Sequence, residues 1–480
     1  MILLLAFLAI VYGQGNCVSL KCYETERQIL INFDEKTLIG YNETITGKEN
    51  KVENLLFSLR KEIIEDFFDP PLSQRNWRDI SDMAKNTQLY KLLKSFPKGA
   101  SLHVHGFCNA FTIITIGTYD PTCYVDLRQD SSTYGFFQYS DKPISDWTNT
   151  VNARRINKDI DILLWNFTQF WTPELHIDET TMWKNFDLVI KRIESLVTNS
   201  DVLHACLLDT FERLTNEGIQ HLELRIPLKP DLINTITYNL LLYNSFGNNL
   251  TIRYIIEHAR SSSVSSDVYP TMIKTLEYMK INSWVVGFDL VGEEDLGLTL
   301  HDYASDFVNI YNYAKNNKYK PLKYIFHCAE TDNVTRASSN SYDAILLDSM
   351  RLGHALGLRN HPGIVKLVKK QGIGLEICPV SNQLLRYFDD IRTHPGSEYI
   401  AEGLPVTLNS DDPDIYGYDS PSPTPDYFMA FLSWDLSLSS LKEIAENSII
   451  YSSLDINTKR NKLTEYQTLY NNWIDSIYVP

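Results

Sequence analysis

The chain has 480 residues and a mass of 55.3 kDa, and its 44 Lys and Arg against 60 Asp and Glu give a formal net charge of −16. Hydrophobic residues make up 44% of the sequence and aromatic residues 12%, which supports a large core and excludes a mainly disordered chain. The acidic balance, with an isoelectric point near 5.2, argues against a broad surface for nucleic acid or anionic membranes.

The first residues, MILLLAFLAIVYGQG, are typical of a secretory signal peptide. The run from Ile2 to Val11 is apolar but too short to cross a bilayer, and Gly13 suits cleavage before Gln14. We therefore expect a signal peptide over residues 1–13, a secreted extracellular protein and no membrane span; the alternative is a buried N-terminal strand or helix. Four N-x-Ser/Thr sequons fit this route as glycosylation sites: Asn42, Asn166, Asn249 and Asn333.

Seven cysteines are too few for a scaffold built from disulfides. All seven follow the predicted cleavage site, and because the number is odd at least one cannot pair within the chain. Cys108 and Cys123 are the candidate disulfide, with two free thiols as the alternative. The apolar surroundings of Cys206, Cys328 and Cys378 predict small buried thiols.

Residues 14–95 are predicted to form a separate helical section. ETERQILINFDEKTLI and NKVENLLFSLRKEIIEDFF carry apolar residues at spacings of three and four, as amphipathic helices do. Residues 107–147 differ, because they mix Thr, Tyr, Gly, Asp and Pro and hold the cysteine pair. We interpret them as an irregular insert rather than one helix.

Eight short apolar runs alternate with helical stretches between residues 96 and 480. The runs are ASLHVHG, IQHLELRI, LTIRYIIEHA, SWVVGFDLVG, LKYIFHCAE, MRLGHAL, GIGLEICPV and LPVTLNS. Eight strands alternating with helices predict an α/β fold, a parallel (β/α)₈ barrel of the TIM type. Its active site is then expected at the C-terminal ends of the strands.

Polar residues stand at the ends of several of these runs. His103 and His105 end the first run and lie two residues apart, so that both imidazoles face one side of a strand. His327 and Asp411 end the fifth and eighth runs. Each motif alone has a commoner explanation, such as a buried histidine or a helix cap. Together, three imidazoles and one carboxylate with an open position predict a catalytic zinc ion, one per chain.

Two further groups are candidates for catalysis. His354 ends the sixth run and would orient the metal-activated water or take its proton. Glu330, three residues after His327, would face the same cavity as a proton donor.

The chain resembles the adenosine deaminase superfamily, and within it the secreted adenosine deaminase-related growth factors. The matching segments run from Phe96 to Gly417 and agree in order and spacing: FPKGASLHVH, MWKNF, LELR, GFDLVGEEDLG, HCAETD, RLGHALGL, EICPVSNQLL and LNSDDPDIYG. The helical front section and the insert resemble the same branch. The resemblance implies a homodimer formed by the front section, and a receptor-binding module in the insert with a cell-surface receptor or glycan as partner.

The resemblance also implies an activity: conversion of adenosine and 2′-deoxyadenosine to the inosine products and ammonia, with zinc-bound hydroxide adding to C6. Glu330 would then protonate the purine N1 and His354 would stabilise the hydroxide. Further residues implied to bind the substrate are Asp412, Trp183, Glu223 and His258.

Several residues depart from the family pattern. Gly106 stands where the family has an acidic residue that contacts the sugar, and Ala259 replaces a histidine for which His258 would compensate. Ala329 and Ala355 stand in place of glycines and would crowd the purine. We therefore expect weak affinity for adenosine. The departures keep two alternatives open: a secreted paralogue with weak or no deaminase activity, acting in growth regulation or adenosine binding, and a zinc amidohydrolase with another amine substrate.

Overall fold

The computed structural model describes residues 19–106, 108–170 and 178–478. The predicted signal peptide, residues 1–13, and Cys17 lie outside the described residues. Among the helices that the structure describes, none combines the length and the apolar character needed to cross a membrane.

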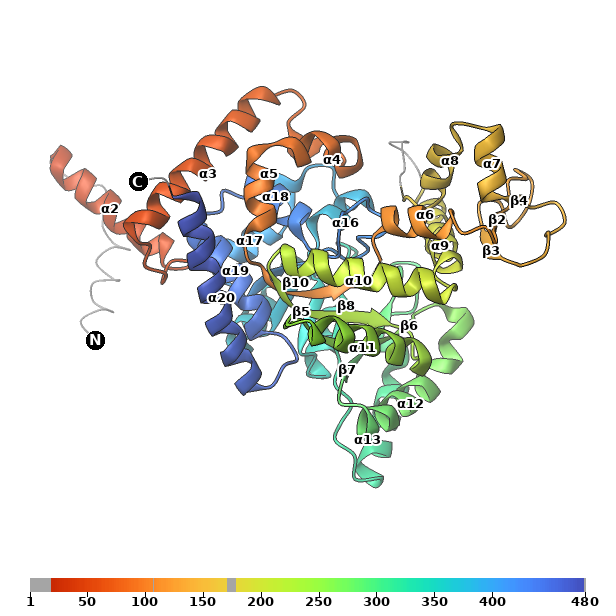
Figure 1. The fold of residues 1–480 in the computed structure, drawn as a ribbon. Coiled ribbons are helices and arrows are strands. Elements are labelled where there is room, and N and C mark those ends of the chain that lie inside the picture. The colour runs from red at the N-terminus through yellow and green to blue at the C-terminus, as the bar shows by residue number, and fades with distance from the viewer. Residues whose placement is uncertain (1–18, 107, 171–177, 479–480) are drawn as a thin grey trace.

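Eight parallel strands form a barrel at the centre of the molecule (Figure 1). Two four-stranded sheets, β1-β5-β6-β7 and β11-β10-β9-β8, are joined by parallel bridges from Val104 to Asp411 and from Phe288 to Tyr324. Each strand overlaps one of the eight predicted runs, which confirms the (β/α)₈ barrel. The strands are β1 (Gly99–Val104), β5 (Ile219–Ile226), β6 (Thr251–Ala259), β7 (Val285–Val291), β8 (Phe326–Cys328), β9 (Arg351–His354), β10 (Gly374–Ile377) and β11 (Val406–Leu408).

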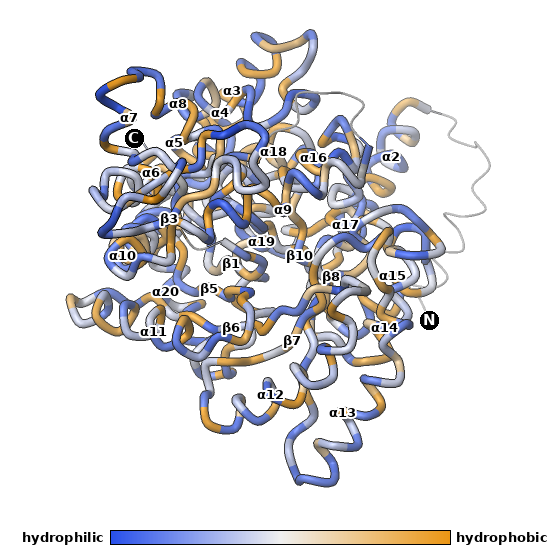
Figure 2. The backbone as a smooth tube through the Cα atoms, turned by 90° about the vertical axis from the view of Figure 1, so that its right-hand side faces the viewer, coloured by the Kyte–Doolittle hydropathy of each residue, from blue (hydrophilic) through white to orange (hydrophobic). Residues whose placement is uncertain are grey.

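Helices cover the outside of the barrel. They alternate between hydrophobic and hydrophilic segments along their length (Figure 2), as expected of helices that bury one face. The α-helices are α9 (Glu179–Leu196), α10 (Ser200–Asn216), α11 (Pro230–Ser245), α12 (Val268–Ile281), α13 (Ala304–Asn316), α14 (Asn340–Leu346), α15 (Pro362–Gln371), α16 (Pro379–Leu384), α17 (Gly396–Ala401), α18 (Thr424–Ser433), α19 (Leu438–Ile450) and α20 (Ile456–Ile477). Short 3₁₀ helices are η2 (Ser262–Asp267), η3 (Leu300–Tyr303), η4 (Leu356–Asn360) and η5 (Ile391–Thr393).

Local sequence signals explain where these helices begin and end. Pro362 stands in the first turn of α15, where its missing N–H costs no hydrogen bond, and Gly372 ends the helix with a φ of 67°. The Asp455 side chain caps α20 by accepting from the N–H groups of Asn457 and Thr458. The strands β1 and β5 are buried along their whole length, because helices cover one face and packed side chains fill the barrel on the other.

The front section is helical, with α2 (Leu20–Glu35), α3 (Gly47–Asp66), η1 (Leu72–Gln74), α4 (Trp77–Asn86) and α5 (Gln88–Ser95). Trp77 is fully buried and packs on Tyr90 and Tyr418, which ties these helices to the barrel end. Helix α3 packs against α5, α18 and α20. Helix α2 differs, because it has no buried residue and projects from the body of the molecule (Figure 1).

The insert after β1 contains more regular structure than its composition indicated. Residues 107–147 contain α6 (Ala110–Gly117), β2 (Cys123–Val125) and β3 (Phe137–Tyr139). The elements β4 (Thr148–Asn149), α7 (Thr150–Ile156) and α8 (Ile160–Phe167) follow directly and continue the same region beyond the predicted bound. The three strands form an antiparallel sheet in the order β3-β2-β4. The Asp126 side chain fixes the turn between β2 and β3 by accepting from Arg128, Ser131 and Thr133.

The predicted disulfide between Cys108 and Cys123 is wrong. Both are buried free thiols, and Cys108 hydrogen-bonds with Cys206 of α10. Cys328 and Cys378 are also buried free thiols, as their surroundings predicted.

Candidate active site

Four side chains converge at the C-terminal ends of β1, β8 and β11; we call them the metal cage. The Nε2 atoms of His103 and His105 lie 3.1 and 3.2 Å from Nε2 of His327, and 3.3 and 3.5 Å from Oδ1 of Asp411. Four ligand atoms placed about 2.1 Å from a tetrahedral zinc ion are about 3.4 Å apart. The donor set and its spacing therefore fit the predicted zinc ion.

Each histidine of the metal cage has a carboxylate on its other ring nitrogen. This contact keeps the ring proton on Nδ1 and leaves the Nε2 lone pair facing the centre of the cage. Three lone pairs and a carboxylate oxygen then point at one another, an arrangement that a cation stabilises. The three contacts are His103 Nδ1 to Glu376 Oε2 at 2.7 Å, His105 Nδ1 to Glu257 Oε2 at 2.8 Å and His327 Nδ1 to Asp289 Oδ2 at 2.7 Å.

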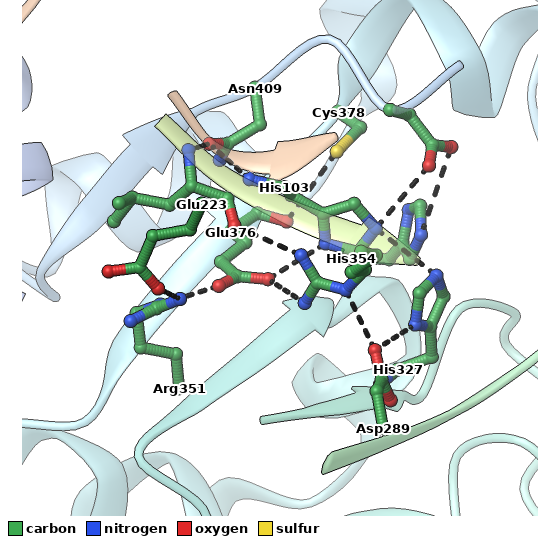
Figure 3. A network of polar contacts seen from close by, with 12 residues as sticks. His103, Glu223, Asp289, His327, Arg351, His354, Glu376, Cys378 and Asn409 are labelled. Atoms are coloured by element: carbon green, nitrogen blue, oxygen red, sulfur yellow. Dashed lines mark hydrogen bonds and ion pairs between the residues drawn. The ribbon is translucent and has the colours of Figure 1, made fainter. Parts of the chain in front are cut away.

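A buried network of arginines and carboxylates supports the cage from inside the barrel (Figure 3). Glu376 accepts from Arg225 Nη2 at 2.7 Å and from Arg351 Nε at 2.5 Å, and Arg225 Nε also donates to Asp289 at 2.8 Å. All these side chains are fully buried. Burial opposes the ionisation of Glu376, but the charges of Arg225 and Arg351 hold its pKa well below the usual range. The carboxylate is therefore charged and rigidly held behind His103.

Sequence analysis missed the three supporting carboxylates. The signal that could have found them is one acidic residue inside an otherwise apolar run, in GLEIC, YIIEHA and GFDLV. A charge in the middle of a buried strand needs a partner, and here the partner is a metal-binding histidine.

A chain of hydrogen bonds fixes the tautomer of His354. The Gly396 N–H donates to His394 Nδ1 at 2.8 Å, so His394 carries its proton on Nε2 and donates it to Asn382 Oδ1 at 3.2 Å. This orients the Asn382 amide nitrogen toward His354 Nδ1, 3.1 Å away. Burial holds the pKa of His354 well below its usual value, so the ring is neutral and its single proton is on Nε2.

The Nε2 atom of His354 faces the reaction site. It lies 3.5 Å from Glu330 Oε1 and 3.9 Å from Asp411 Oδ2, and within the described part of the chain it has no hydrogen-bond partner. Burial, with the negative charges of Asp411 and Glu294, raises the pKa of Glu330 well above its usual value. This shift favours the protonated form of Glu330, beside a histidine that offers an N–H.

The metal cage opens into a cavity of about 750 Å³. Its inner end is polar and includes His105, His327, Glu330, Asp411 and Asp412. Its outer wall is apolar and includes Trp183, Phe186, Ile190, Pro227 and Leu232. A cavity of this size with a few convergent polar groups is typical of small-molecule sites. The structure thus places two of the implied substrate contacts, Trp183 and Asp412, in the cavity wall.

Two other implied substrate contacts are wrong. Glu223 does not line the cavity; it is fully buried in the barrel and pairs with Arg351 at 2.6 Å. His258 lies between Glu257 and Ala259, which both line the cavity. Because successive side chains of a strand point to opposite faces, His258 points away from the cavity and does not compensate for Ala259.

The alanines that replace family glycines do not narrow the cavity. Ala329 and Ala355 are buried but do not line it, so the expected crowding of the purine is wrong. Their φ angles are 58° and 55°, and those of His354 and Asp411 are 62° and 59°. Left-handed backbone costs about 1–2 kcal/mol for residues other than glycine and is concentrated at functional sites.

An acidic group is present where sequence analysis found none. A Cβ built on Gly106 would overlap the carboxylate of Asp414, which comes from the loop after β11 and lines the cavity. Burial raises the pKa of Asp414 to about 7. The expectation that this end of the cavity lacks a carboxylate is therefore wrong, because a different loop supplies one.

The parallel barrel carries a cage of three histidines and one aspartate at the C-terminal ends of its strands. This combination of fold and site is typical of metal-dependent hydrolases built on a barrel. The adenosine deaminase family model matches residues 242–468. Adenosine deaminase 2 of Dictyostelium discoideum is 31% identical over 94% of this chain and 85% of its own length. Adenosine deaminase 2 of Sus scrofa is 27% identical over 94% of each chain.

A solved amidohydrolase from Burkholderia ambifaria, described with bound Zn, shares the fold, with a TM-score of 0.53 and 16% identity over 80% of this chain and 94% of that chain. The chain belongs to the adenosine deaminase family, whose members are hydrolases that act on purines. This confirms the resemblance found in the sequence.

Proposed function

We propose that the protein is a zinc-dependent deaminase that converts adenosine and 2′-deoxyadenosine, with water, to the inosine products and ammonia. The observation that carries this proposal is the approach of His354 Nε2 to Glu330 Oε1, 3.5 Å apart, beside the metal cage. His103, His105, His327 and Asp411 would hold one zinc ion. When bound, zinc supplies a Lewis acid that lowers the pKa of a water molecule toward about 7.

The side chains around the cage suit the proton transfers of deamination. Burial raises the pKa of Glu330, and its carboxyl group would donate a proton to purine N1 while the water oxygen adds to C6. The Nε2–H of His354 would orient that oxygen. Burial and the charge of Asp411 raise the pKa of Asp412 well above its usual value, so Asp412 would donate a hydrogen bond to purine N7. One proton of the water goes to N6, so that ammonia leaves as the C6–N6 bond breaks and the C6 carbonyl forms, and the other proton restores the carboxyl group of Glu330.

The test is purified protein with a measured zinc content, assayed by the fall in absorbance as adenosine becomes inosine. Glu330→Gln keeps the shape of the side chain but lacks a carboxyl proton, so activity should fall roughly 10²–10⁴-fold with zinc retained. Asp332→Asn is the control, because Asp332 is exposed and pairs with Arg359. Wild-type activity in Glu330→Gln, or a full zinc complement in His327→Ala, would contradict the proposal.

We infer that the protein is secreted and glycosylated. The support is the apolar N-terminal sequence together with the exposure of every sequon: Asn42, Asn166, Asn249 and Asn333. Expression in cells with a secretory pathway should place the protein in the medium, and glycosidase treatment should lower its apparent mass. Retention in the cytosol without glycan would refute this.

We propose that the front section, residues 14–95, makes the protein a homodimer and that the insert, residues 107–147, binds a cell-surface receptor or glycan. Helix α2 supports the first proposal, because it exposes Leu20 and Leu30 by 75% and 53%. The position of the insert supports the second, because the insert lies at the opposite end of the molecule from α2 (Figure 1). Cell binding by the intact chain and by a chain without the insert would test it.

A further inference from the structure

We propose that the Asp414 carboxylate binds a hydroxyl group of the substrate's sugar. The carboxylate occupies the space that a side chain at position 106 would fill. This inference rests on the proposed function, since it names the group that holds the sugar of the nucleoside.

The first observation is the position of the Asp414 carboxylate. Gly106 directly follows the cage residue His105, and a Cβ on Gly106 would overlap all three atoms of the Asp414 carboxylate. Position 106 can therefore hold no side chain while Asp414 stays in place. The carboxylate is next to the metal-cage end of the cavity and not at its outer mouth.

The second observation is that, among the residues that the structure describes, none forms an ion pair with the Asp414 carboxylate; His105 acts on it only at longer range. It is buried and lines the cavity, and its Oδ1 accepts from the N–H of Ile415 at 3.1 Å. No other residue in the described part of the chain hydrogen-bonds to this carboxylate or forms an ion pair with it. Its neutral donors are the backbone N–H groups of Asp414 and Ile415, and a buried carboxylate with only neutral donors is costly unless a ligand supplies another.

The chemistry of the proposed substrate identifies that donor. Adenosine is uncharged, and its N–H donors belong to the 6-amino group, which must lie at the metal cage. The remaining donors are the sugar hydroxyls. The loop after β11 presents Asp411 to the metal and Asp412 to the base, and Asp414 follows Pro413 along the same cavity wall. Asp414 is therefore the carboxylate of this loop that remains for the sugar.

The experiment measures kcat/KM for adenosine and for 2′-, 3′- and 5′-deoxyadenosine. The wild-type enzyme should disfavour one of the three analogues by roughly 10- to 150-fold, the worth of a hydrogen bond to a charged acceptor. Asp414→Ala should lower kcat/KM for adenosine by that factor and leave the value for the same analogue nearly unchanged. A purely structural role for Asp414 would lower the values for all four substrates together.

A second variant displaces the carboxylate without removing it. Gly106→Ala should displace the Asp414 carboxylate and so reproduce the loss of discrimination between adenosine and the deoxy analogue. The double variant with Gly106→Ala and Asp414→Ala should show no further loss of kcat/KM beyond that of either single variant. Gly363→Ala is the matched control, because a Cβ there meets no atom within 4 Å. Zinc content and thermal unfolding of each variant show that the cage and the fold persist.

Three outcomes would overturn the inference: equal loss for all four substrates in Asp414→Ala, no loss for any of them, or full discrimination in Gly106→Ala. If the wild-type protein with zinc does not deaminate adenosine, the proposed function fails separately. Calorimetric binding of adenosine and the three analogues to wild type and Asp414→Ala then decides the role of Asp414.

Discussion

Replacing Glu376 by Gln would test the buried network beneath the metal cage. Glu376 accepts from Arg225, Arg351 and His103 at 2.5–2.7 Å, and all four side chains are fully buried. Gln has the same shape and can still accept one or two of these bonds, but it carries no charge. The change therefore leaves two buried guanidinium groups facing a neutral amide.

The magnitude follows from the loss of one partner of a buried ion pair, which costs about 3–5 kcal/mol of stability. Arg225 keeps Asp289 and Arg351 keeps Glu223, so we expect the lower part of that range. Loss of the carboxylate behind a metal-binding histidine lowers metal affinity roughly 10–100-fold. Urea unfolding must be measured with the metal chelated, because bound metal stabilises the native state by an amount that depends on its concentration.

The matched control is Glu257→Gln. Glu257 makes the same contact to a cage histidine, at 2.8 Å to His105 Nδ1, but its side chain is 20% exposed and, among the described residues, no arginine pairs with it. It should lower metal affinity similarly while changing metal-free stability by less than about 1 kcal/mol. Equal destabilisation by the two substitutions, or a change below about 1 kcal/mol for Glu376→Gln, would refute the reasoning.

Three further predictions follow from single positions. Gly353→Ala should lower zinc content, measured by metal analysis, because its Cβ would lie 2.8 Å from Cε1 of His103. Leu30→Glu should convert the proposed dimer to a monomer in light scattering, since Leu30 is 53% exposed on α2; a wild-type monomer would refute the dimer. Hydrogen bonds from Arg128 hold the pKa of Asp126 well below its value of about 3.9 in the unfolded chain. The ionised Asp126 side chain therefore stabilises the fold above about pH 3.9, and this stabilisation is lost as the pH falls below that value. Asp126→Asn should remove that contribution at neutral pH, which limited proteolysis of the insert would detect.

The barrel and the metal cage could be predicted because their signals lie within single runs. His103 and His105 are two residues apart on one strand, and their alternation fixes a common face whatever the rest of the fold. His327 and Asp411 end two other runs, and the barrel topology brings all parallel strand ends to one edge. Short-range pattern and fold class together thus located the cage.

The remaining errors concern contacts between distant segments. Glu223 was assigned to the substrate because the LELR segment matches the family, but Arg351, 128 residues later, pairs with it inside the barrel. His258 was assigned to the substrate, but its side chain lies on the face of β6 that points away from the cavity. The contact of the neighbouring Glu257 with the cage residue His105 shows which face of the strand is turned to the site. Asp414 fills the space beside Gly106 from a loop more than 300 residues away. Such partners depend on packing, which no local pattern encodes.

Two residues of the insert, Cys108 and Phe136, line the cavity, so the insert and the substrate site share part of their structure. Phe136 lines the cavity, while its carbonyl accepts from the N–H of Asp126 at the end of β2. If a partner bound the insert and shifted this turn, it would change the shape of the cavity. Thermodynamic reciprocity would then require that a ligand in the cavity alter the affinity of the insert for that partner by the same factor.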